Sequence, residues 1–219
     1  MRKVRRPRSL AELGLAEPDS TGRVAARRPP PARSLERSPG ENLPRARQAL
    51  PAQVRILGLD PGSLCTGYAV VEAAGGHIAY VVSGSIRTEG KALPQRLQEI
   101  FVAVERLTAE FKPDEVAIEG VFMHRNAGSA LKLGQARGAA LSATFSVRPR
   151  VFEYAPRAVK LAVVGTGAAQ KEQVQLMVKR LLNISGPLAA DAADALAIAL
   201  CHAHSRKVHG MVSAADLRQ

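Results

Sequence analysis

Four acidic residues occupy positions from which their side chains could bind a divalent cation. Asp60 ends the apolar run VRILGLD, and Glu119 ends the run VAIE. Asp191 and Asp194 lie three residues apart and would share one face of an Ala-rich helix. Carboxylates held side by side away from water raise each other's pKa and are costly unless a cation compensates them. Because oxygen ligands suit Mg²⁺ or Mn²⁺, the pattern predicts a metal site.

Each acid also has a structural explanation when it is taken singly. Asp60 precedes Pro61-Gly62 and could be a turn residue. Asp191 and Asp194 could stabilise the first turn of a helix by capping it and by interacting with its dipole. Nothing about a strand end requires a glutamate at position 119. Four such carboxylates in a basic protein are difficult to explain as structure, so the metal site is the favoured interpretation.

A strong positive charge accompanies these acids. The chain has 219 residues, a formal net charge of +12 and a sequence pI of about 10.5. Such values favour a polyanionic partner, either nucleic acid or an anionic membrane surface, although a generally basic soluble protein is the alternative. No run approaches the roughly 18 uninterrupted apolar residues of a spanning helix. Acids in AELGLAEPDS argue against a signal peptide, so we expect a cytoplasmic protein without a membrane segment.

The two cysteines, Cys65 and Cys201, are too few for a disulfide framework or a four-thiolate metal site. We expect each to behave as a small buried apolar residue and assign neither any chemistry.

The N-terminal segment differs in composition from the rest of the chain. Residues 1–50 hold seven of the fourteen prolines, twelve Lys or Arg and five Asp or Glu, and no aromatic residue. We therefore predict a disordered basic extension over 1–52, one folded domain over 53–205 and a C-terminal tail over 206–219. The extension could add DNA affinity through phosphate contacts, could be dispensable, or could reflect a true start at Val54. The other 169 residues are themselves basic, at about +5.

Hydrophobic periodicity predicts one α/β domain. Three strands joined by short turns should form an antiparallel meander, and Lys112-Pro113-Asp114 should stop the helix that follows them. A mixed five-stranded sheet flanked by helices accommodates the whole order. The predicted strands are 54–60, 67–73, 77–88, 115–120 and 151–154, and the predicted helices are 93–111, 128–145, 156–163, 170–182 and 190–203.

Four segments carry a resemblance to a known family. They are LGLDPGSLCTGYAVVE (57–72), VAIEGVFMHRNAGSALKLGQARGAAL (116–141), VFEYAPRAVKLAVVGTGAAQKEQVQLMV (151–178) and ADAADALAIALCH (190–202). The chain resembles the RuvC-type crossover junction endodeoxyribonucleases, or Holliday junction resolvases, over essentially all of 54–204. Leu64-Cys65 departs from the polar or basic pair expected before Thr66-Gly67, and the N-terminal extension has no counterpart in the family.

This resemblance implies a ribonuclease-H-like fold and a homodimer that nicks two opposed strands of a four-way DNA junction symmetrically, in recombination and DNA repair. It assigns the catalytic and metal-binding roles to Asp60, Glu119, Asp191 and Asp194. We expect two Mg²⁺ ions per subunit, replaceable by Mn²⁺, with Asp60 as the bridging ligand. The resemblance also implies a branch-migration helicase complex (RuvA and RuvB) as a partner.

The resemblance further implies DNA contacts. Phe122 would wedge against an unstacked base at the crossover, although a core phenylalanine is the alternative. Lys160 and Lys171 match positions of phosphate-contacting lysines. Weaker candidates, which could equally be solvated surface charges, are Arg125, Lys132, Arg137 and Arg157. The helix 128–145 could form the dimer surface through small residues at Ser129, Gly134, Gly138 and Ala139, or could pack on the sheet.

Two other functions are compatible with parts of the sequence. DPGSLCTG also resembles the phosphate loop of the actin and sugar-kinase superfamily, which would make the chain an ATP-binding phosphotransferase. The chain is about half the length that such a protein needs and lacks a second phosphate loop. A catalytically silent junction-binding protein is the second alternative, but its four carboxylates would then serve no purpose.

Overall fold

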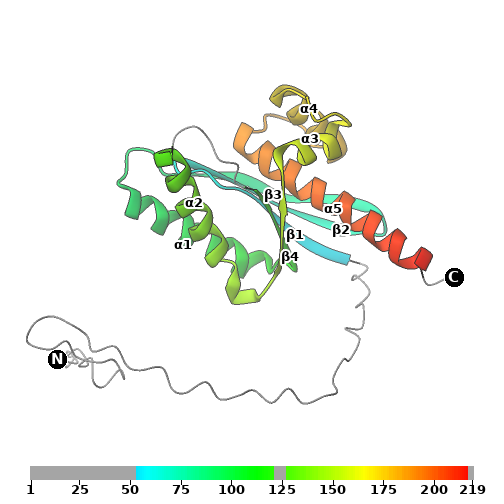
Figure 1. Cartoon of the computed structure of the whole chain (residues 1–219), viewed down its shortest axis with the longest axis horizontal. Helices are drawn as coiled ribbons and strands as arrows, with labels where there is room; N and C mark the ends of the chain where they lie inside the picture. The colour runs from blue at the N-terminus through cyan, green and yellow to red at the C-terminus, as the bar shows by residue number, and fades with distance from the viewer. Residues whose placement is uncertain (1–52, 121–126, 217–219) are drawn as a thin grey trace, which may run out of the picture. The chain divides into compact units, whose positions relative to one another are not determined.

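The computed structural model describes residues 53–120 and 127–216, and the side chains of the last helix as far as Arg206. The predictions for the extension 1–52, for Phe122 and for Arg125 lie outside these residues. Five strands form one mixed sheet in the order β3-β2-β1-β4-β5 (Figure 1). Both β1 and β3 pair antiparallel with β2, whereas β1, β4 and β5 run parallel. The strands are β1 (Gln53–Asp60), β2 (Cys65–Ala74), β3 (His77–Arg87), β4 (Glu115–Glu119) and β5 (Arg150–Tyr154).

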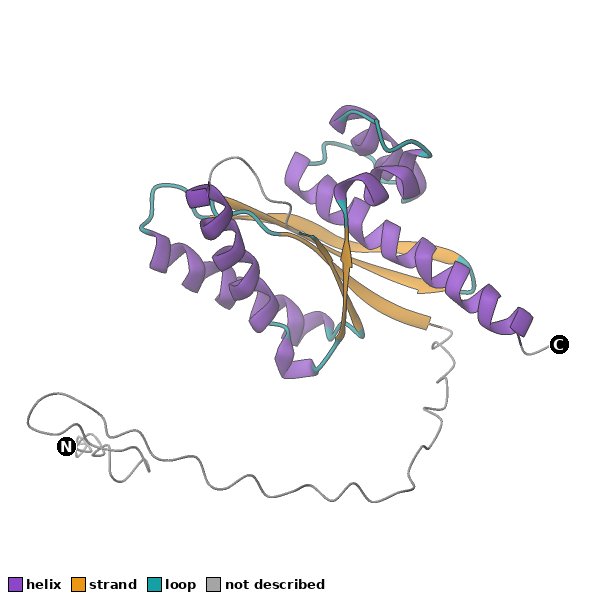
Figure 2. Cartoon of the chain, in the orientation of Figure 1, coloured by secondary structure: helices purple, strands orange, loops and turns teal. Residues whose placement is uncertain are grey.

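Helices cover both faces of this sheet, as predicted (Figure 2). The helices α1 (Leu93–Phe111) and α2 (Ala127–Ser142) lie on one face, and α3 (Pro156–Val164), α4 (Lys171–Leu181) and α5 (Ala190–Asp216) lie on the other. A short 3₁₀ helix, η2 (Phe145–Val147), follows α2. The α/β class and the antiparallel meander of the first three strands are therefore confirmed.

The alternation of side chains along β1 divides the core into two layers. Val54 and Ile56 pack with α3, α4 and α5, while Leu57 and Leu59 pack with α1 and α2. Such a strand is covered on both faces, which explains why its sequence is an almost continuous apolar run. Asp60, the polar residue at the end of this strand, is only partly buried and lies at the edge of the core.

Close contact between α5 and the sheet sets the position of the helix that carries two of the four acids. A Cβ atom at Gly58 would overlap with the backbone oxygen of Ala195, and one at Gly67 would overlap with the backbone oxygen of Asp191. Ala195 and Ala199 on the facing side of α5 are fully buried. Small residues on both partners therefore let the first turns of α5 lie directly on the end of β1 and the start of β2.

Two helix boundaries differ from the prediction. The helix α2 ends at Ser142 and not at 145, because the chain tightens into η2 and leaves Phe145 57% exposed. The final helix α5 continues from the predicted end at 203 to Asp216, so the predicted boundary at 205 falls inside it. Arg206 forms an ion pair with the buried Glu115, a long-range contact that periodicity cannot reveal. No helix in the described part of the chain is long and apolar enough to cross a membrane.

Candidate active site

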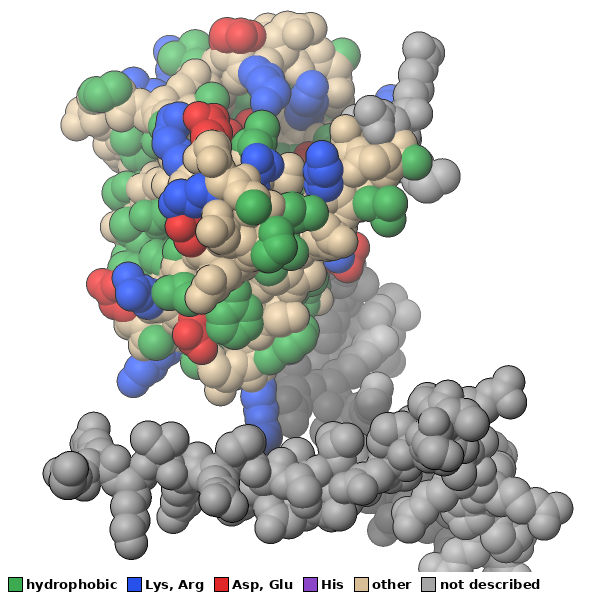
Figure 3. Space-filling model, turned by 90° about the vertical axis from the view of Figure 1, so that its left-hand side faces the viewer, with side chains coloured by type: hydrophobic (Ala, Val, Ile, Leu, Met, Phe, Trp, Pro, Cys, Tyr) green, Lys and Arg blue, Asp and Glu red, His purple; other side chains and the backbone are tan. Residues whose placement is uncertain are grey.

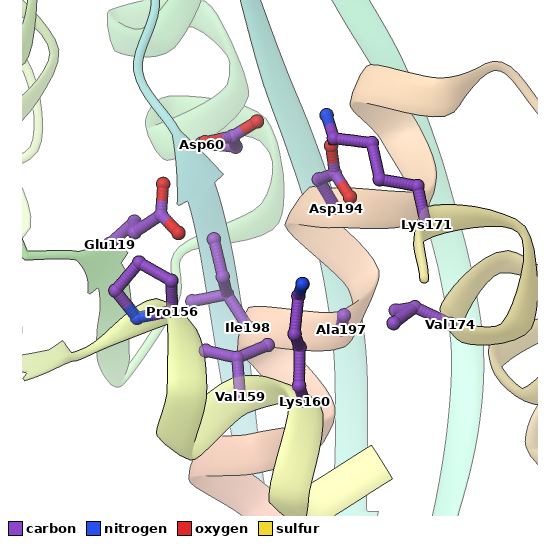
Figure 4. A pocket seen from close by; sticks show the side chains of 10 residues that line it. All are labelled: Asp60, Glu119, Pro156, Val159, Lys160, Lys171, Val174, Asp194, Ala197 and Ile198. Atoms are coloured by element: carbon purple, nitrogen blue, oxygen red, sulfur yellow. The ribbon is translucent and has the colours of Figure 1, made fainter. Parts of the chain in front are cut away.

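The parallel pairing of β1 with β4 brings two of the predicted acids together. Leu59 is opposite Ile118, so the next residues, Asp60 and Glu119, leave the sheet side by side at its carboxyl edge. The start of α5 adds Asp194 to the same place. These three carboxylates line a pocket of about 500 Å³ with Lys160, Lys171 and five apolar side chains (Figure 4); the apolar residues are Pro156, Val159, Val174, Ala197 and Ile198.

Asp60 is a carboxylate of this pocket whose negative charge is disfavoured by its surroundings. Burial and the nearby negative charges of Glu119 and Asp194 raise the pKa of Asp60 to about 7, against an ordinary value of 3.8, and the charge of Lys171 opposes this only in part. Burial is the largest cause of this shift, and the two neighbouring carboxylates add to it, so the negative charge of Asp60 is disfavoured in this pocket. A bound cation would stabilise that charge.

One lysine already supplies positive charge at this position. Lys171 begins α4, and its Nζ lies 3.2 Å from Oδ2 of Asp194. The charge of Asp194 is the main cause that raises the pKa of Lys171, with smaller contributions from Asp60 and Asp191. In Figure 4 the amino groups of Lys160 and Lys171 point toward the space between the carboxylates. The predicted phosphate-binding lysines thus lie at the site, and their contact with DNA stays a prediction.

Asp191 has a different neighbour from the other three acids. Its Oδ2 accepts a hydrogen bond from Sγ of Cys65 at 3.0 Å, and its side chain is not among those that line the pocket. Burial and this hydrogen bond raise the pKa of the Cys65 thiol to about 11, so the sulfur carries its proton at neutral pH and donates it. The expectation that Cys65 is only a small apolar residue is therefore wrong. Cys201 is buried, as expected.

The donor chemistry of the site fits a hard divalent cation, because every candidate ligand is a carboxylate. The ligand shell is not complete in this conformation: within residues 53–120 and 127–206, no three His, Cys, Asp or Glu side chains form a ready-made metal site. A further observation favours a metal: the positively charged ammonium of Lys171 already lies against Asp194 and interacts electrostatically with Asp60. Asp60, Glu119 and Asp194, which line the pocket, and Asp191, whose charge also acts on Lys171, are the residues that would hold one.

The remaining predicted DNA contacts have different surroundings. Arg137 pairs with Glu153 at 2.6 Å and donates from Nε to the backbone oxygen of Glu119 at 3.4 Å, which ties α2 to the strand end below the pocket. Lys132 on α2 and Arg157 at the start of α3 are exposed. Their DNA-binding roles are untested and stay predictions.

Sequence reasoning missed the apolar wall of the pocket. Val159 and Val174 are nearly buried and stand beside the lysines that follow or precede them on α3 and α4. Valines at helical spacing are typical of core residues, so nothing in the sequence singled them out. The helices that carry these valines, α3 and α4, also carry the predicted lysines Lys160 and Lys171. That link could have indicated that apolar side chains approach the carboxylates beside the basic ones.

A mixed sheet in this order, with carboxylates at the ends of two parallel strands and on the last helix, defines a nuclease of the ribonuclease-H-like class. Residues 56–202 match the model of the family described as "Crossover junction endodeoxyribonuclease RuvC". Since the match spans more than half of the chain, the protein belongs to this family.

Individual relatives agree with this assignment. The chain is 54% identical to the crossover junction endodeoxyribonuclease RuvC of Vibrio cholerae over 152 residues, which cover 69% of this chain and 88% of the relative. It is 53% identical to that of Methylococcus capsulatus over 159 residues, 73% of this chain and 96% of the relative. Among solved structures, Thermus thermophilus RuvC in complex with a Holliday junction substrate matches with a TM-score of 0.67 and 34% identity, over 72% of this chain and 97% of that one.

A more distant structure supports the fold alone. The yeast mitochondrial Holliday junction resolvase Ydc2 matches with a TM-score of 0.54 at 13% identity, over 76% of this chain and 87% of that one. Family, ribonuclease-H-like fold and endodeoxyribonuclease class are therefore confirmed as predicted. The phosphotransferase alternative is not supported by the family assignment.

Proposed function

We propose that this protein resolves four-way DNA junctions by nicking two opposed strands, with Mg²⁺ held by Asp60, Glu119, Asp191 and Asp194. The observation that carries the metal site is the grouping of three carboxylates in one pocket, where burial and mutual repulsion raise the pKa of Asp60 to about 7. The substrate is supported by family membership and by the Thermus thermophilus relative, whose structure holds a Holliday junction.

The protein's own groups have separate tasks in this proposal. When bound, a pair of divalent ions supplies an activated water on one side of the scissile phosphate and stabilises the leaving 3′ oxygen on the other. Asp60 lies between Glu119 and Asp194 (Figure 4), so it would hold a metal together with either neighbour. The apolar side chains of Val159 and Val174 limit the entry of bulk water behind these groups. Mn²⁺, which also prefers oxygen ligands, should substitute for Mg²⁺.

Lysines at the rim of the pocket are suited to hold the DNA backbone. The side chain of Lys171 is 76% exposed and pairs with Asp194 from its tip, so the same ammonium can reach a phosphate that enters the pocket. Lys160 extends into the pocket from the next helix. A DNA phosphate paired with these two lysines would lie next to the carboxylates, where a bound metal would act on it.

A homodimer is part of the proposal, because two equivalent sites suit two equivalent strands. The outer face of α2 offers a surface for it. Leu131 is 69% exposed, and a Cβ atom at Gly134 or Gly138 would meet nothing within 4 Å, so this face packs on no described part of the chain. Figure 3, which views the molecule from the side of α1 and α2, shows hydrophobic side chains interspersed with Lys and Arg. An apolar exposed face of this kind favours association.

The remaining elements of the proposal come from the resemblance to the family. They are a wedge at Phe122, a branch-migration helicase complex as a partner and action in the cytoplasm. Phe122→Ala tests the first of these, because loss of a wedge should impair junction cutting without lowering the melting temperature. A core phenylalanine would instead cost about 3–5 kcal/mol of stability when truncated.

A cleavage assay with matched substrates tests the central proposal. Synthetic four-way junctions and linear duplexes of the same sequences, labelled on each strand in turn, are incubated with Mg²⁺, Mn²⁺, Ca²⁺ or EDTA. We expect nicks at symmetry-related positions in two opposed strands, only in Mg²⁺ or Mn²⁺, with ligatable 5′-phosphate ends. Glu119→Gln is the inactive control. Equal cutting of linear duplex, or cutting in EDTA, would contradict the proposal.

A further inference from the structure

The fourth acid of the proposed site, Asp191, accepts a hydrogen bond from a cysteine. Asp191 is half-buried in the first turn of α5, and a carboxylate there could rotate toward solvent. In the structure it does not, because Sγ of Cys65 donates to its Oδ2 at 3.0 Å. The two residues lie 126 positions apart in the chain, and they meet because Gly67 lets α5 lie directly on the start of β2.

Cys65 itself stands at the end of a rigid loop. The backbone oxygen of Leu64 accepts hydrogen bonds from both the backbone nitrogen and the hydroxyl of Thr88, at 2.9 and 3.1 Å. The hydroxyl of the buried Thr66 donates to the backbone oxygen of Gly62 at 3.0 Å. This loop directly follows Asp60, so the same segment fixes one proposed metal ligand and carries the thiol that contacts another. The donor to Asp191 is therefore held in place before any ligand binds.

We propose that Cys65 is a positioning residue for metal binding: its thiol holds one oxygen of Asp191 in a fixed place next to the pocket, so that this carboxylate is available to a metal bound by the other three acids. This inference rests on the proposed function, in which Asp191 is a metal ligand. Carboxylates that bind metals are themselves commonly fixed by hydrogen bonds from neighbouring groups, and loss of such a partner typically weakens metal affinity or activity by about 10- to 100-fold.

The alternative role for Cys65 is to fill space between β2 and α5. The two roles differ in what they affect. A space-filling thiol contributes to stability whatever the state of Asp191, whereas a positioning thiol acts only through Asp191 and changes the metal requirement of the enzyme. Serine is the useful substitution, because it retains a donor in nearly the same place while alanine removes it.

The test measures metal binding directly and by activity. Mn²⁺ binding to the full-length parent, Cys65→Ser, Cys65→Ala and Asp191→Asn proteins is followed by electron paramagnetic resonance, and the Mg²⁺ concentration for half-maximal junction nicking is measured in parallel. We expect Cys65→Ala to weaken Mn²⁺ binding and to raise the Mg²⁺ requirement by about 10-fold, with little change in melting temperature. Cys65→Ser should stay closer to the parent than to Cys65→Ala. Cys201→Ala, which removes the other thiol, should leave both metal measurements unchanged.

A double substitution separates the possible outcomes. If Cys65 acts through Asp191, then Cys65→Ala should have no further effect on metal binding in the Asp191→Asn background. An equal effect in both backgrounds would overturn the inference, as would unchanged metal binding in Cys65→Ala when Asp191→Asn binds Mn²⁺ more weakly. If Asp191→Asn itself binds Mn²⁺ like the parent and nicks with the same Mg²⁺ requirement, the proposed role of Asp191 fails, and the inference fails with it.

Discussion

Two glutamates on the same short strand, Glu115 and Glu119, have opposite electrostatic surroundings. Glu115 begins β4 and its side chain is 0% exposed, whereas Glu119 ends β4 at the mouth of the proposed active site. The first is surrounded by cations and donors. The second shares its pocket with two further carboxylates, Asp60 and Asp194. Burial alone therefore does not identify a functional acid in this protein; the balance of charge around it does.

The surroundings of Glu115 form a closed network. Its carboxylate pairs with Arg150, with Nε of Arg206 at 2.6 Å and with Nε2 of His202 at 2.7 Å, while Nδ1 of that histidine lies 2.7 Å from the hydroxyl of Tyr154. Burial would raise the pKa of Glu115, but the hydrogen bond from His202 and the charges of the two arginines outweigh it and lower the pKa below 4.5. This network joins the start of β4 to β5 and α5.

At the other end of β4 the balance is reversed. Burial and repulsion by Glu119 and Asp194 raise the pKa of Asp60 to about 7, and one lysine offsets only part of this. A folded domain retains such an imbalance at a cost in stability, which functional sites commonly show. We therefore expect substitutions at the pocket to lower activity and spare stability, and substitutions at Glu115 to lower stability and spare activity.

The largest effect is expected for Asp60→Asn. The change is nearly isosteric and removes one negative charge from the proposed ligand set, so nicking of a four-way junction in Mg²⁺ should fall by about a thousandfold or more. Junction affinity should be retained, because it comes mainly from lysines and arginines on phosphates. Single-turnover nicking and binding in Ca²⁺, measured for parent and variant, check both parts.

The same variant should be more stable than the parent in EDTA at neutral pH, since it removes a repulsive charge. Asn also retains the turn-forming ability of Asp before Pro61. Nicking at the parental rate would remove Asp60 from the site. A lower melting temperature would show that Asp60 is a structural acid like Glu115, and the comparison between the two ends of β4 would fail.

The next largest effect is expected for Glu115→Gln, now on stability. Loss of the carboxylate charge leaves Arg206, whose side chain is 12% exposed, without its counter-charge. Removal of one partner from a buried ion pair typically costs about 3–5 kcal/mol, and we expect the lower end because Arg150 is only half-buried. Thermal unfolding should show a midpoint lower by about 6–12 °C.

Glu119→Gln is the matched control on the same strand. It should leave the unfolding midpoint near that of the parent and abolish nicking, whereas Glu115→Gln should nick normally at temperatures well below its midpoint. Equal loss of stability in the two variants would contradict the division of roles between them.

These contrasts also show which features the sequence could predict. Strand and helix periodicity located every element of the sheet, and the acids at two strand ends marked Asp60 and Glu119 as candidates that could meet. The parallel pairing of β1 with β4, which the structure shows, brings them together. The contacts of Glu115 could not be predicted from the sequence. An acid at the start of an apolar strand gives no local sign of partners such as Arg150 and Arg206, which come from distant parts of the chain.

The same limit explains the other two misses. Cys65 and Asp191 lie 126 positions apart, and no local sequence pattern predicts the hydrogen bond between them. The extension of α5 past 203 depends in part on the ion pair of Arg206, another contact far along the chain. Sequence patterns thus predicted the elements and the acids at their ends, while long-range pairing determined which acids are compensated.

The smallest expected effect is a difference in how stability changes with pH. Asp60 has a folded-state pKa of about 7 against 3.8 for an ordinary aspartate. Between these values the folded protein holds a proton that the unfolded chain has lost, so the metal-free protein should lose stability as pH rises from about 4 to about 7. Glu115 acts with the opposite sign: its pKa is lowered, so its contribution is present above about pH 4.5 and is lost as pH falls through the folded-state pKa.

The window from pH 5 to pH 7 separates the two acids, since Glu115 is ionised in both states there whereas Asp60 changes its protonation; the histidines are common to parent and variant. In EDTA, the unfolding midpoint of Asp60→Asn minus that of the parent should therefore grow across this window, by about 2 kcal/mol or roughly 5 °C, and level off above about pH 7. Thermal scans at half-unit pH steps measure it. In saturating Mg²⁺ the difference should shrink or reverse, because a bound cation stabilises the ionised carboxylate. A constant difference from pH 5 to pH 7 would mean that Asp60 is already ionised in the folded protein, and that the pocket end of β4 is as well compensated as the Glu115 end.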